Sequence, residues 1–278
     1  MTETVHPLVR RVLANNPSPF TYQGTQTYIV GRGEVAVIDP GPDLADHVEA
    51  IVAATAGERI AALMCTHTHR DHSPATRPLQ AATGAEIVGC APLALVDDGP
   101  RADASFDADY APDRIMADGE SVRGPGWTLT AVATPGHTSN HLCFALPEAG
   151  ALFTGDHVMG WATTVISPPD GDMADYMRSL DRLMDRDDSV YYPAHGDPVE
   201  NPRRFVRGLM GHRKQREGQI LRLLAKAPHT IPAMVEQMYR GLDPRLHGAA
   251  GRSVLAHLID LETRGLAARE GETWRRVT

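Results

Sequence analysis

Four side chains that can bind a metal lie within six residues of one another, directly after a run of apolar residues. The run at 60–65 (IAALMC) is short and continuous, which is typical of a buried strand. The next residues, 66–72, read THTHRDH and supply His67, His69, Asp71 and His72. A strand that ends in a polar loop presents several side chains at one sheet edge, where imidazoles and a carboxylate can converge on cations. This segment therefore predicts a metal site.

Three more strand ends carry histidine or aspartate. The segments at 127–134, 151–154 and 190–192 have strand patterns, and the loops after them contain His137, Asp156 and His195 respectively. In a sandwich of two sheets, several strand ends meet at one edge, so residues far apart in the sequence can form one site. We therefore expect all seven side chains to meet there.

The donor set suits two cations. We expect His67, His69 and His137 to hold one zinc ion, Asp71, His72 and His195 to hold a second, and Asp156 to bridge them. Zinc can lower the pKa of a bound water to about 7, so a bridging hydroxide can act as the nucleophile at neutral pH. Asp71 is the expected catalytic carboxylate, which orients this hydroxide and accepts its proton.

Three residues near these loops have two interpretations each. Asp39 also ends a strand, where it is either a hydrogen-bond acceptor for a ligand histidine or a turn residue before Pro40. His141 and His157 adjoin the ligand loops. Each either contacts the substrate or makes hydrogen bonds without binding a metal.

The composition excludes several classes of protein. With 278 residues, 42% of them hydrophobic, the chain can bury a sizeable core. No apolar stretch approaches the ~20 residues that span a bilayer, and no secretion signal begins the chain, so we expect a cytoplasmic protein without membrane contact. Three cysteines, an odd number, favour core thiols over disulfides. A formal net charge of −8 argues against strong non-specific binding of nucleic acid.

Strand and helix patterns alternate before residue 200. Residues 25–40 predict a hairpin, and 44–56 and 75–83 predict helices that glycines terminate. Further strands are expected at 86–89 and 141–146, and a further helix at 175–184. Residues 91–120 show little periodicity and predict an irregular excursion near the site. We expect this excursion and residues 157–172 to supply the side chains that select the substrate.

The pattern becomes helical after Pro202. Helices are expected at 203–225, 231–239 and 249–264, and a closing hairpin at 266–277 completes a winged-helix pattern. We predict a catalytic domain at 1–202 and a winged-helix-like domain at 203–278. Nine Lys or Arg and seven Asp or Glu in 217–278 give this part about +2. This weak charge favours a module that packs against the catalytic domain and shapes its cleft over one that recognises DNA.

The ligand segments together resemble those of the metallo-β-lactamase superfamily. Strand-terminal Asp39, THTHRDH, His137 in TPGHT, Asp156 in FTGDH and His195 in PAHGD occur in the order typical of that family. The resemblance implies an αββα sandwich, an α/β fold with a binuclear metal site between the sheet edges. Asp156 is similar to the bridging aspartate of the glyoxalase II and ribonuclease branches.

The opening NPSPFTYQGTQTYIVG, the PAHGDPVENP segment and the C-terminal helices with a wing resemble the β-lactamase-like protein 2 family. This resemblance leaves two enzymatic hypotheses open. The first is hydrolysis of a small-molecule thioester, lactone or related ester, and the second is metal-dependent cleavage of single-stranded RNA. A winged-helix regulator is a remote third hypothesis. Two Zn²⁺ ions are the expected cofactors, with iron or manganese as alternatives.

Overall fold

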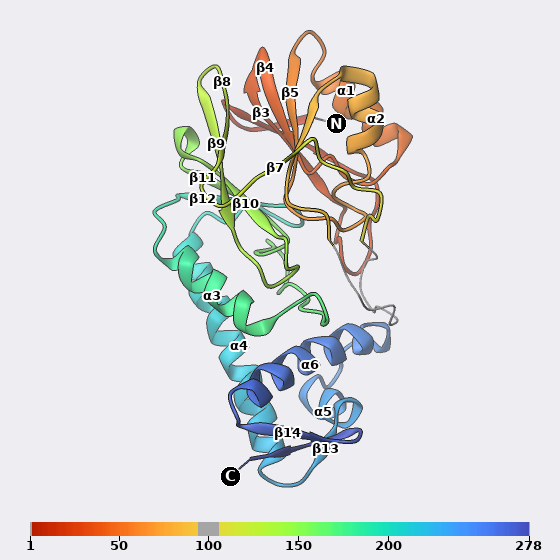
Figure 1. Cartoon of the computed structure of the whole chain (residues 1–278), viewed down its shortest axis with the longest axis vertical. Helices are drawn as coiled ribbons and strands as arrows, with labels where there is room; N and C mark the ends of the chain where they lie inside the picture. Colours follow the sequence, from red (N-terminus) through yellow and green to blue (C-terminus); the bar gives the residue numbers. More distant parts are fainter. Residues whose placement is uncertain (1, 94–105, 278) are drawn as a thin grey trace.

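The computed structural model describes residues 2–93 and 106–277. Two β-sheets with helices on their outer faces form the larger part of the molecule (Figure 1). Three helices and a small sheet, drawn in cyan to blue, form the part that carries the C-terminus. The loops that carry the predicted metal ligands lie on the side of the sandwich that faces these helices. The candidate site is therefore between the two parts of the molecule.

The first sheet contains seven strands within the described residues, arranged in sequence order. They are β1 (Thr2–His6), β2 (Val9–Leu13), β3 (Gln26–Arg32), β4 (Glu34–Ile38), β5 (Arg59–Cys65), β6 (Glu86–Gly89) and β7 (Arg114–Ile115). Strands β3 and β4 form the predicted hairpin, and β4 to β7 are mutually parallel. Parallel strands deliver their carboxyl ends to one edge, and the segment 66–72 follows β5 at that edge.

The second sheet contains five strands in the described part of the chain, in the order β12-β11-β10-β9-β8. They are β8 (Ser121–Gly124), β9 (Trp127–Ala133), β10 (Leu142–Leu146), β11 (Ala151–Gly155) and β12 (Val190–Pro193). β11 and β12 are parallel, so Asp156 and His195 leave the same end of the sheet. The sequence did not predict β1, β2 or β8, which are short strands with several exposed or half-buried residues.

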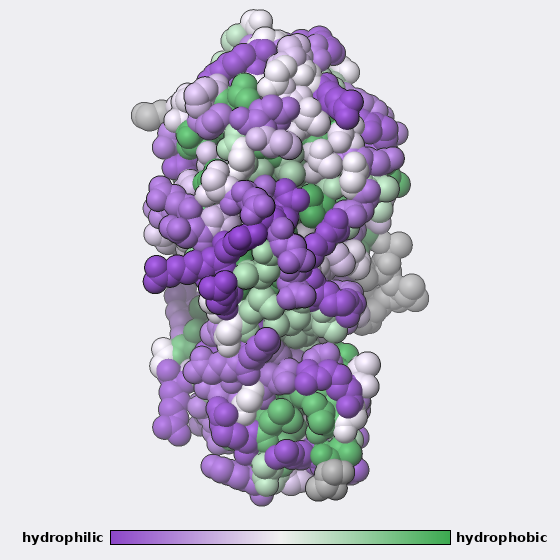
Figure 2. Space-filling view, turned by 90° about the vertical axis from the view of Figure 1, so that its left-hand side faces the viewer, coloured by the Kyte–Doolittle hydropathy of each residue, from purple (hydrophilic) through white to green (hydrophobic). Residues whose placement is uncertain are grey.

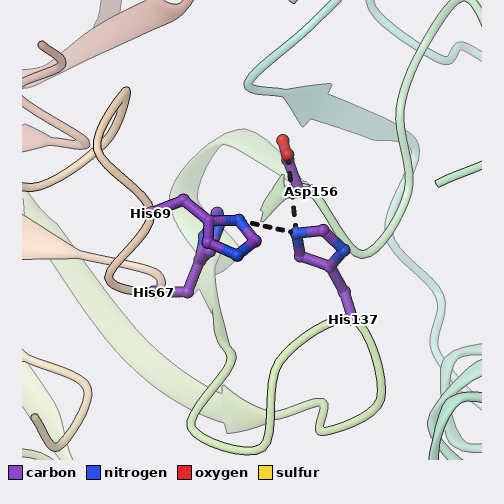
Figure 3. A group of neighbouring side chains, drawn as sticks. All are labelled: His67, His69, His137 and Asp156. Atoms are coloured by element: carbon purple, nitrogen blue, oxygen red, sulfur yellow. Dashed lines mark hydrogen bonds and ion pairs between the residues drawn. The ribbon is translucent and has the colours of Figure 1, made fainter. Parts of the chain in front are cut away.

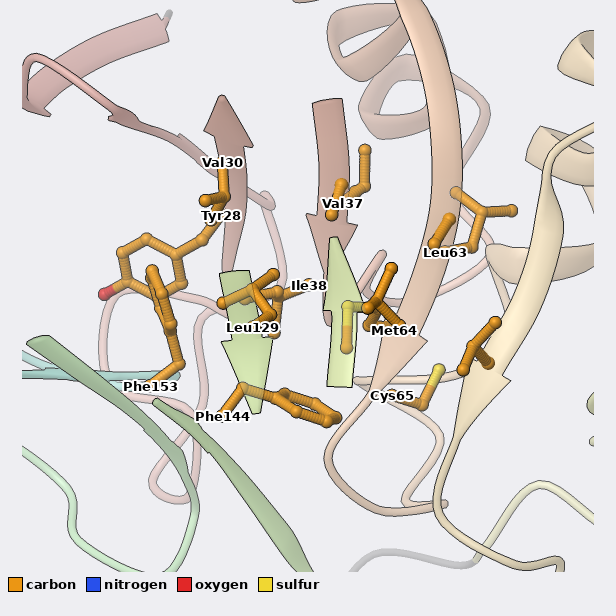
Figure 4. Packing of buried hydrophobic residues seen from close by; sticks show 14 of the residues in the cluster. Tyr28, Val30, Val37, Ile38, Leu63, Met64, Cys65, Leu129, Phe144 and Phe153 are labelled. Carbon is orange, nitrogen blue, oxygen red and sulfur yellow. The ribbon is translucent and has the colours of Figure 1, made fainter. Parts of the chain in front are cut away.

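The two sheets bury one hydrophobic core between them. Figure 4 shows residues of β3 to β5, such as Ile38 and Met64, packed against Leu129, Phe144 and Phe153 of the second sheet. Helices α1 (Ala45–Ala54) and α2 (Thr76–Thr83) cover the first sheet. Helix α3 (Met173–Met184) covers the second sheet through a second core. The predicted αββα sandwich is confirmed.

Helix α4 (Pro202–Leu224) connects the two parts of the molecule. Val206 and Leu209 pack in the core that α3 shares with the second sheet, whereas Ile220 and Leu224 pack in a third core. That third core also involves α5 (Ile231–Met238), α6 (His247–Thr263) and the three-stranded sheet of β13 (His229–Thr230), β14 (Ala267–Glu270) and β15 (Thr273–Arg276). The domain division at residue 202 stays a prediction, because α4 contributes to both cores.

Hydrophilic side chains predominate on the face of the molecule drawn in Figure 2, and hydrophobic ones gather over its lower, C-terminal part. No helix within residues 2–93 and 106–277 is long and apolar enough to span a bilayer. The three cysteines are buried and unpaired, as the sequence predicted.

Candidate metal centre

Four of the predicted ligands form one group. His67 and His69 come from the loop after β5, His137 from the loop after β9, and Asp156 from the end of β11. Figure 3 shows the three imidazoles pointing toward one another and Asp156 beside His137. His69 Nδ1 lies 3.0 Å from His67 Nε2 and 3.1 Å from His137 Nε2. Three ring nitrogens therefore converge on one point, as metal coordination requires.

The other three predicted ligands, Asp71, His72 and His195, form a second group. Asp71 Oδ2 lies 3.1 Å from His195 Nε2 and 3.3 Å from His72 Nε2. Both rings are buried, and the Asp71 side chain is 16% exposed. This group thus offers two imidazole nitrogens and a carboxylate, of which the carboxylate is the part that solvent reaches.

Asp156 lies between the two groups. Its Oδ2 is 3.7 Å from His137 Nε2, whereas its Oδ1 is 3.3 Å from His195 Nε2 and 3.6 Å from His72 Nε2. Each oxygen of one carboxylate therefore faces a different group of imidazoles. This arrangement fits a ligand that two cations share. The chain places Asp156 with the help of Gly155, whose φ is 48° and where a Cβ atom would lie 2.6 Å from Thr66 Oγ1.

The ring nitrogens that face away from the centre have their own partners. His137 Nδ1 lies 2.7 Å from the carbonyl oxygen of Val165 and 3.0 Å from Thr164 Oγ1. His195 Nδ1 lies 3.2 Å from Gly24 O, and His67 Nδ1 lies 3.0 Å from Thr66 Oγ1. Acceptors at this outer position fix the tautomer and orientation of an imidazole and raise its basicity toward a metal.

Asp39 is the outer partner of His72. Its Oδ2 lies 3.1 Å from His72 Nδ1, and its carboxylate also accepts hydrogen bonds from the backbone and hydroxyl of Thr66. The residue is buried and has a φ of 46°, a conformation that costs free energy in a residue other than glycine. Of the two interpretations that the sequence left open, the structure supports the hydrogen-bond acceptor.

His141 and His157 are buried and do not line the cavity next to the site. His141 accepts a hydrogen bond from the backbone N–H of Asp156 at 3.3 Å, and its other nitrogen lies 2.9 Å from Thr134 Oγ1. It therefore orients the Asp156 loop. His157 packs against the ring of Tyr176, and neither of its nitrogens has a hydrogen-bond partner among the described residues.

The pKa values differ between the two groups. Burial lowers the pKa of His69 to about 3, with a further contribution from His137, and burial likewise lowers the pKa of His67. In the second group, burial lowers the pKa of His195, but Asp156 and Asp71 outweigh it and raise the pKa to about 10. The same carboxylates raise the pKa of His72 against the effect of burial. The second group is thus a place where positive charge is held.

Two atoms test whether the residues fit metal ions. His72 Nε2 and Asp156 Oδ1 are buried and have no hydrogen-bond partner in the described part of the chain. Both face the centre of the second group, where they lie 3.6 Å apart. Buried polar atoms without a partner cost free energy, and a cation between them would satisfy both. The donor set therefore fits divalent metals.

A cavity of about 730 Å³ opens beside the two groups. One end is formed by candidate ligands, namely His69, Asp71, His137, Asp156 and His195. Residues 18–21, Met159 and residues 161–165 form its sides, so part of the predicted segment 157–172 reaches it. The helical end of the lining comes from α4 (His212, Arg213, Arg216) and from residues 239–253, chiefly Tyr239, Leu242, Leu246 and two alanines. Polar and apolar residues both contribute to this lining, but most of the surface that they expose to the cavity is apolar.

Sequence reasoning expected the C-terminal module to shape the cleft, and residues 239–253 do line the cavity. It did not name the individual residues of that module or assign residues 18–21 to the site, because neither segment carries a metal-type motif. Part of the predicted excursion at 91–120 lies outside the described residues. Its later part runs beside the site, since Asp107 N donates to Thr68 O and Phe106 forms a β-bridge with His69. The described residues of this excursion do not line the cavity.

Comparisons with known proteins match both parts of the chain. The model of the metallo-beta-lactamase superfamily matches residues 20–195, and that of the beta-lactamase associated winged helix domain matches residues 230–274. The chain is 32% identical over 268 residues to a beta-lactamase-like protein 2 homolog of Drosophila melanogaster, covering 92% of this chain and 88% of that protein. It is 34% identical over 226 residues to an atrochrysone carboxyl ACP thioesterase of Aspergillus fumigatus, covering 79% and 65%.

A solved structure shares the complete fold. The crystal structure of a beta-lactamase domain protein from Burkholderia ambifaria superposes with a TM-score of 0.83 at 23% identity, covering 99% of this chain and 93% of that one. The family models, these relatives and the two groups of histidines and aspartates agree with one another. The chain belongs to the metallo-beta-lactamase superfamily, a family of hydrolases that typically bind divalent metals, and it carries the winged-helix domain associated with that superfamily.

Proposed function

We propose that the chain is a binuclear zinc-dependent hydrolase of a small thioester, lactone or related ester. The observation that carries this proposal is the position of Asp156 between two groups of ligands at the end of a large, mostly apolar cavity. An apolar cavity suits the acyl part of an ester or thioester. The predominance of imidazole over carboxylate ligands favours zinc, with iron and manganese as the alternatives.

Asp71 is the residue to which we assign proton transfer. When bound, two zinc ions would acidify a water molecule and polarise the carbonyl group of the scissile bond. Asp71 Oδ2 accepts a hydrogen bond from Thr25 Oγ1 at 3.2 Å, and this contact fixes the carboxylate next to the cavity. His72 and His195 lower the pKa of Asp71 well below its usual range even though burial raises it. The carboxylate is therefore ionised and can accept the proton of the attacking water.

The similarity to the Aspergillus fumigatus thioesterase supports the thioester as the first substrate class to test. Single-stranded RNA is the competing substrate. An RNA strand binds to basic grooves with stacking side chains, and the cavity lining does include arginines and aromatic residues such as Arg216 and Tyr239. The surface of the cavity is mostly apolar, which favours the acyl substrate.

Elemental analysis and a panel of four substrates test the proposal. We expect two equivalents of zinc, turnover of an acyl thioester or a lactone, loss of turnover on chelation, and recovery when zinc is restored. A penam and a single-stranded RNA complete the panel, and Asp71→Ala is the inactive control. Cleavage of RNA without turnover of either ester would overturn the substrate assignment. A metal content below one equivalent with activity indifferent to chelators would overturn the binuclear site.

A further inference from the structure

Two arginines on helix α4 face the cavity without an acidic partner. Arg213 and Arg216 are one helical turn apart, and both line the cavity that the candidate ligands also line. Neither forms an ion pair in the part of the chain that the structure describes, whereas surface arginines such as Arg182 and Arg264 pair with carboxylates. The acidic residues that line the cavity are Asp71 and Asp156, which belong to the metal centre.

Arg213 is a buried cation. It is 3% exposed, its Nη2 donates to the carbonyl oxygen of Thr164 at 2.6 Å, and its guanidinium lies 5.1 Å from the centre of the Tyr176 ring. Its Nε has no hydrogen-bond partner among the described residues. Burying a charge without a counter-charge costs several kcal/mol in order of magnitude. Such a cation is expected where a ligand brings the missing negative charge.

Arg216 is fixed by its neighbours. Its Nη1 donates to the carbonyl oxygen of Met238 and to Gln219, each at 2.9 Å, and its guanidinium lies 4.2 Å from the centre of the Tyr239 ring. These contacts are to neutral groups, so they hold the side chain in place and leave its charge unbalanced. A guanidinium held in one orientation is well suited to bind a carboxylate or phosphate.

The positive charge of the two arginines contributes to the lowered pKa values of nearby histidines. Burial, followed by Arg213 and other basic neighbours, lowers the pKa of His257 to about 3. Burial, followed by Arg213 and Arg216, also lowers the pKa of His212, which lines the same end of the cavity. The imidazoles at this end therefore stay neutral near pH 7 and do not supply a counter-charge or compete for an anion.

We propose that Arg213 and Arg216 form an anion subsite, which binds a carboxylate or phosphate group of a substrate whose scissile bond lies at the metal end of the cavity. This inference rests on the proposed hydrolase function. Apolar residues of the same lining, such as Leu242 and Leu246, would contact the body of the acyl group. The substrate is then an amphipathic anion, which distinguishes it from a neutral fatty acyl ester.

Four thioesters test this subsite and separate the two sources of the anion. Octanoyl and 7-carboxyheptanoyl groups differ by a terminal carboxylate, and each is attached to N-acetylcysteamine or to coenzyme A, which adds phosphates. We expect the wild type to prefer at least one anionic thioester over octanoyl-N-acetylcysteamine. Arg216→Gln should lower kcat/KM for that anionic thioester by about 10- to 100-fold, and by less than about threefold for the neutral one.

If Arg216→Gln loses kcat/KM on the 7-carboxyheptanoyl thioesters, the bound anion is the carboxylate of the acyl group. If it loses kcat/KM on the coenzyme A thioesters, the bound anion is a phosphate of the carrier. Arg216→Lys should restore part of the lost activity, since it keeps the charge. Arg207→Gln is the matched control, because Arg207 is an exposed residue of the same helix outside the cavity. An equal loss on all four thioesters, or no loss on any, would show that Arg216 is merely structural and would overturn the subsite.

A binding measurement keeps the inference testable if no thioester is hydrolysed. Suberate and inorganic phosphate are titrated calorimetrically into the chelator-treated full-length protein, so that metal ions do not contribute to binding. We expect at least one of these anions to bind, with a Kd that rises about tenfold or more in Arg216→Gln and stays within a factor of two in Arg207→Gln. Absence of turnover combined with this binding result would reject the proposed substrate class and retain the subsite. The same Kd in all three proteins, or no binding, would reject the subsite.

Discussion

The two ends of the cavity differ in how their charged side chains are balanced. At the metal end, Asp71 and Asp156 lie among imidazoles, and every positive charge near them has a carboxylate within about 4 Å. At the helical end, Arg213 and Arg216 contact carbonyl groups and aromatic rings, and neither forms an ion pair with a carboxylate of residues 2–93 or 106–277. The first end is built to hold cations and the second to receive an anion.

Asp156→Ala should have the largest effect, because both groups of imidazoles lose the carboxylate that lies between them. We expect metal content to fall from two equivalents to one or fewer and kcat to fall by about three orders of magnitude. Elemental analysis and steady-state kinetics measure the two changes. Asp187→Ala, at an exposed surface position, is the control. Two retained equivalents would argue that Asp156 does not bridge.

Asp39→Asn is expected to have the next largest effect. The substitution keeps the size of the side chain but removes the charge beside His72 Nδ1. Loss of such an outer partner weakens metal binding by about 10- to 100-fold. Competition against a chromophoric chelator measures the affinity. An unchanged affinity would mean that Asp39 is important for the turn after β4 and not for the metal centre.

The pH dependence of the stability of His257→Gln tests the environment of this buried histidine, which lies near Arg213. The folded pKa of His257, about 3, lies below the unfolded value near 6.5, so only the unfolded chain takes up this proton as the pH falls between them. Stability contributed by the neutral ring is complete above pH 6.5 and declines below it. Glutamine binds no proton, so the variant should lose about 1–2 kcal/mol less than the wild type between pH 7.5 and pH 5.

Urea unfolding at the two pH values measures this difference. His247→Gln, at an exposed position of the same helix, is the matched control. Parallel stability curves for the wild type and His257→Gln would contradict the lowered pKa that burial and, after it, Arg213 give to His257.

Thr164→Val should have the smallest effect. It tests a residue that contacts both Arg213 and the candidate ligand His137. Thr164 accepts the hydrogen bond of Arg213 through its backbone, and its hydroxyl lies 3.0 Å from His137 Nδ1. Valine keeps the shape and the backbone contact, and Val165 O remains a partner of His137. We expect kcat to fall about three- to tenfold with little change in thermal stability. Thr163→Val, in the same cavity lining, should leave kcat within a factor of two.

Local sequence patterns predicted the framework of the site well. The helix after β4 and the helix before Gly84 were correctly placed, because apolar periodicity and a left-handed glycine at φ 70° are local signals. The loop after β5 was recognised because its histidines are close together in the sequence. Asp39 was left with two interpretations, since its contact with His72 spans 33 residues and depends on how β4 and β5 pair.

The basic residues of α4 show where local patterns are not sufficient. The sequence places Arg203, Arg213 and their neighbours on one helix but does not distinguish exposed from buried arginines. In the structure, Arg203 pairs with Asp187 at the surface, whereas Arg213 is buried against Thr164 and Tyr176. Helical periodicity cannot assign these roles, because α4 packs against different elements along its length.

The sequence by itself determined which donor side chains are available, since the candidate ligand types and their place at strand ends follow from local patterns. Only the tertiary structure decided the geometry, in which Asp156 has one oxygen toward each group and Arg213 and Arg216 line the same cavity as the candidate ligands. The physical reason is that ligand identity is a property of single side chains. The balance of charge in a cavity is a sum over elements that meet only after folding.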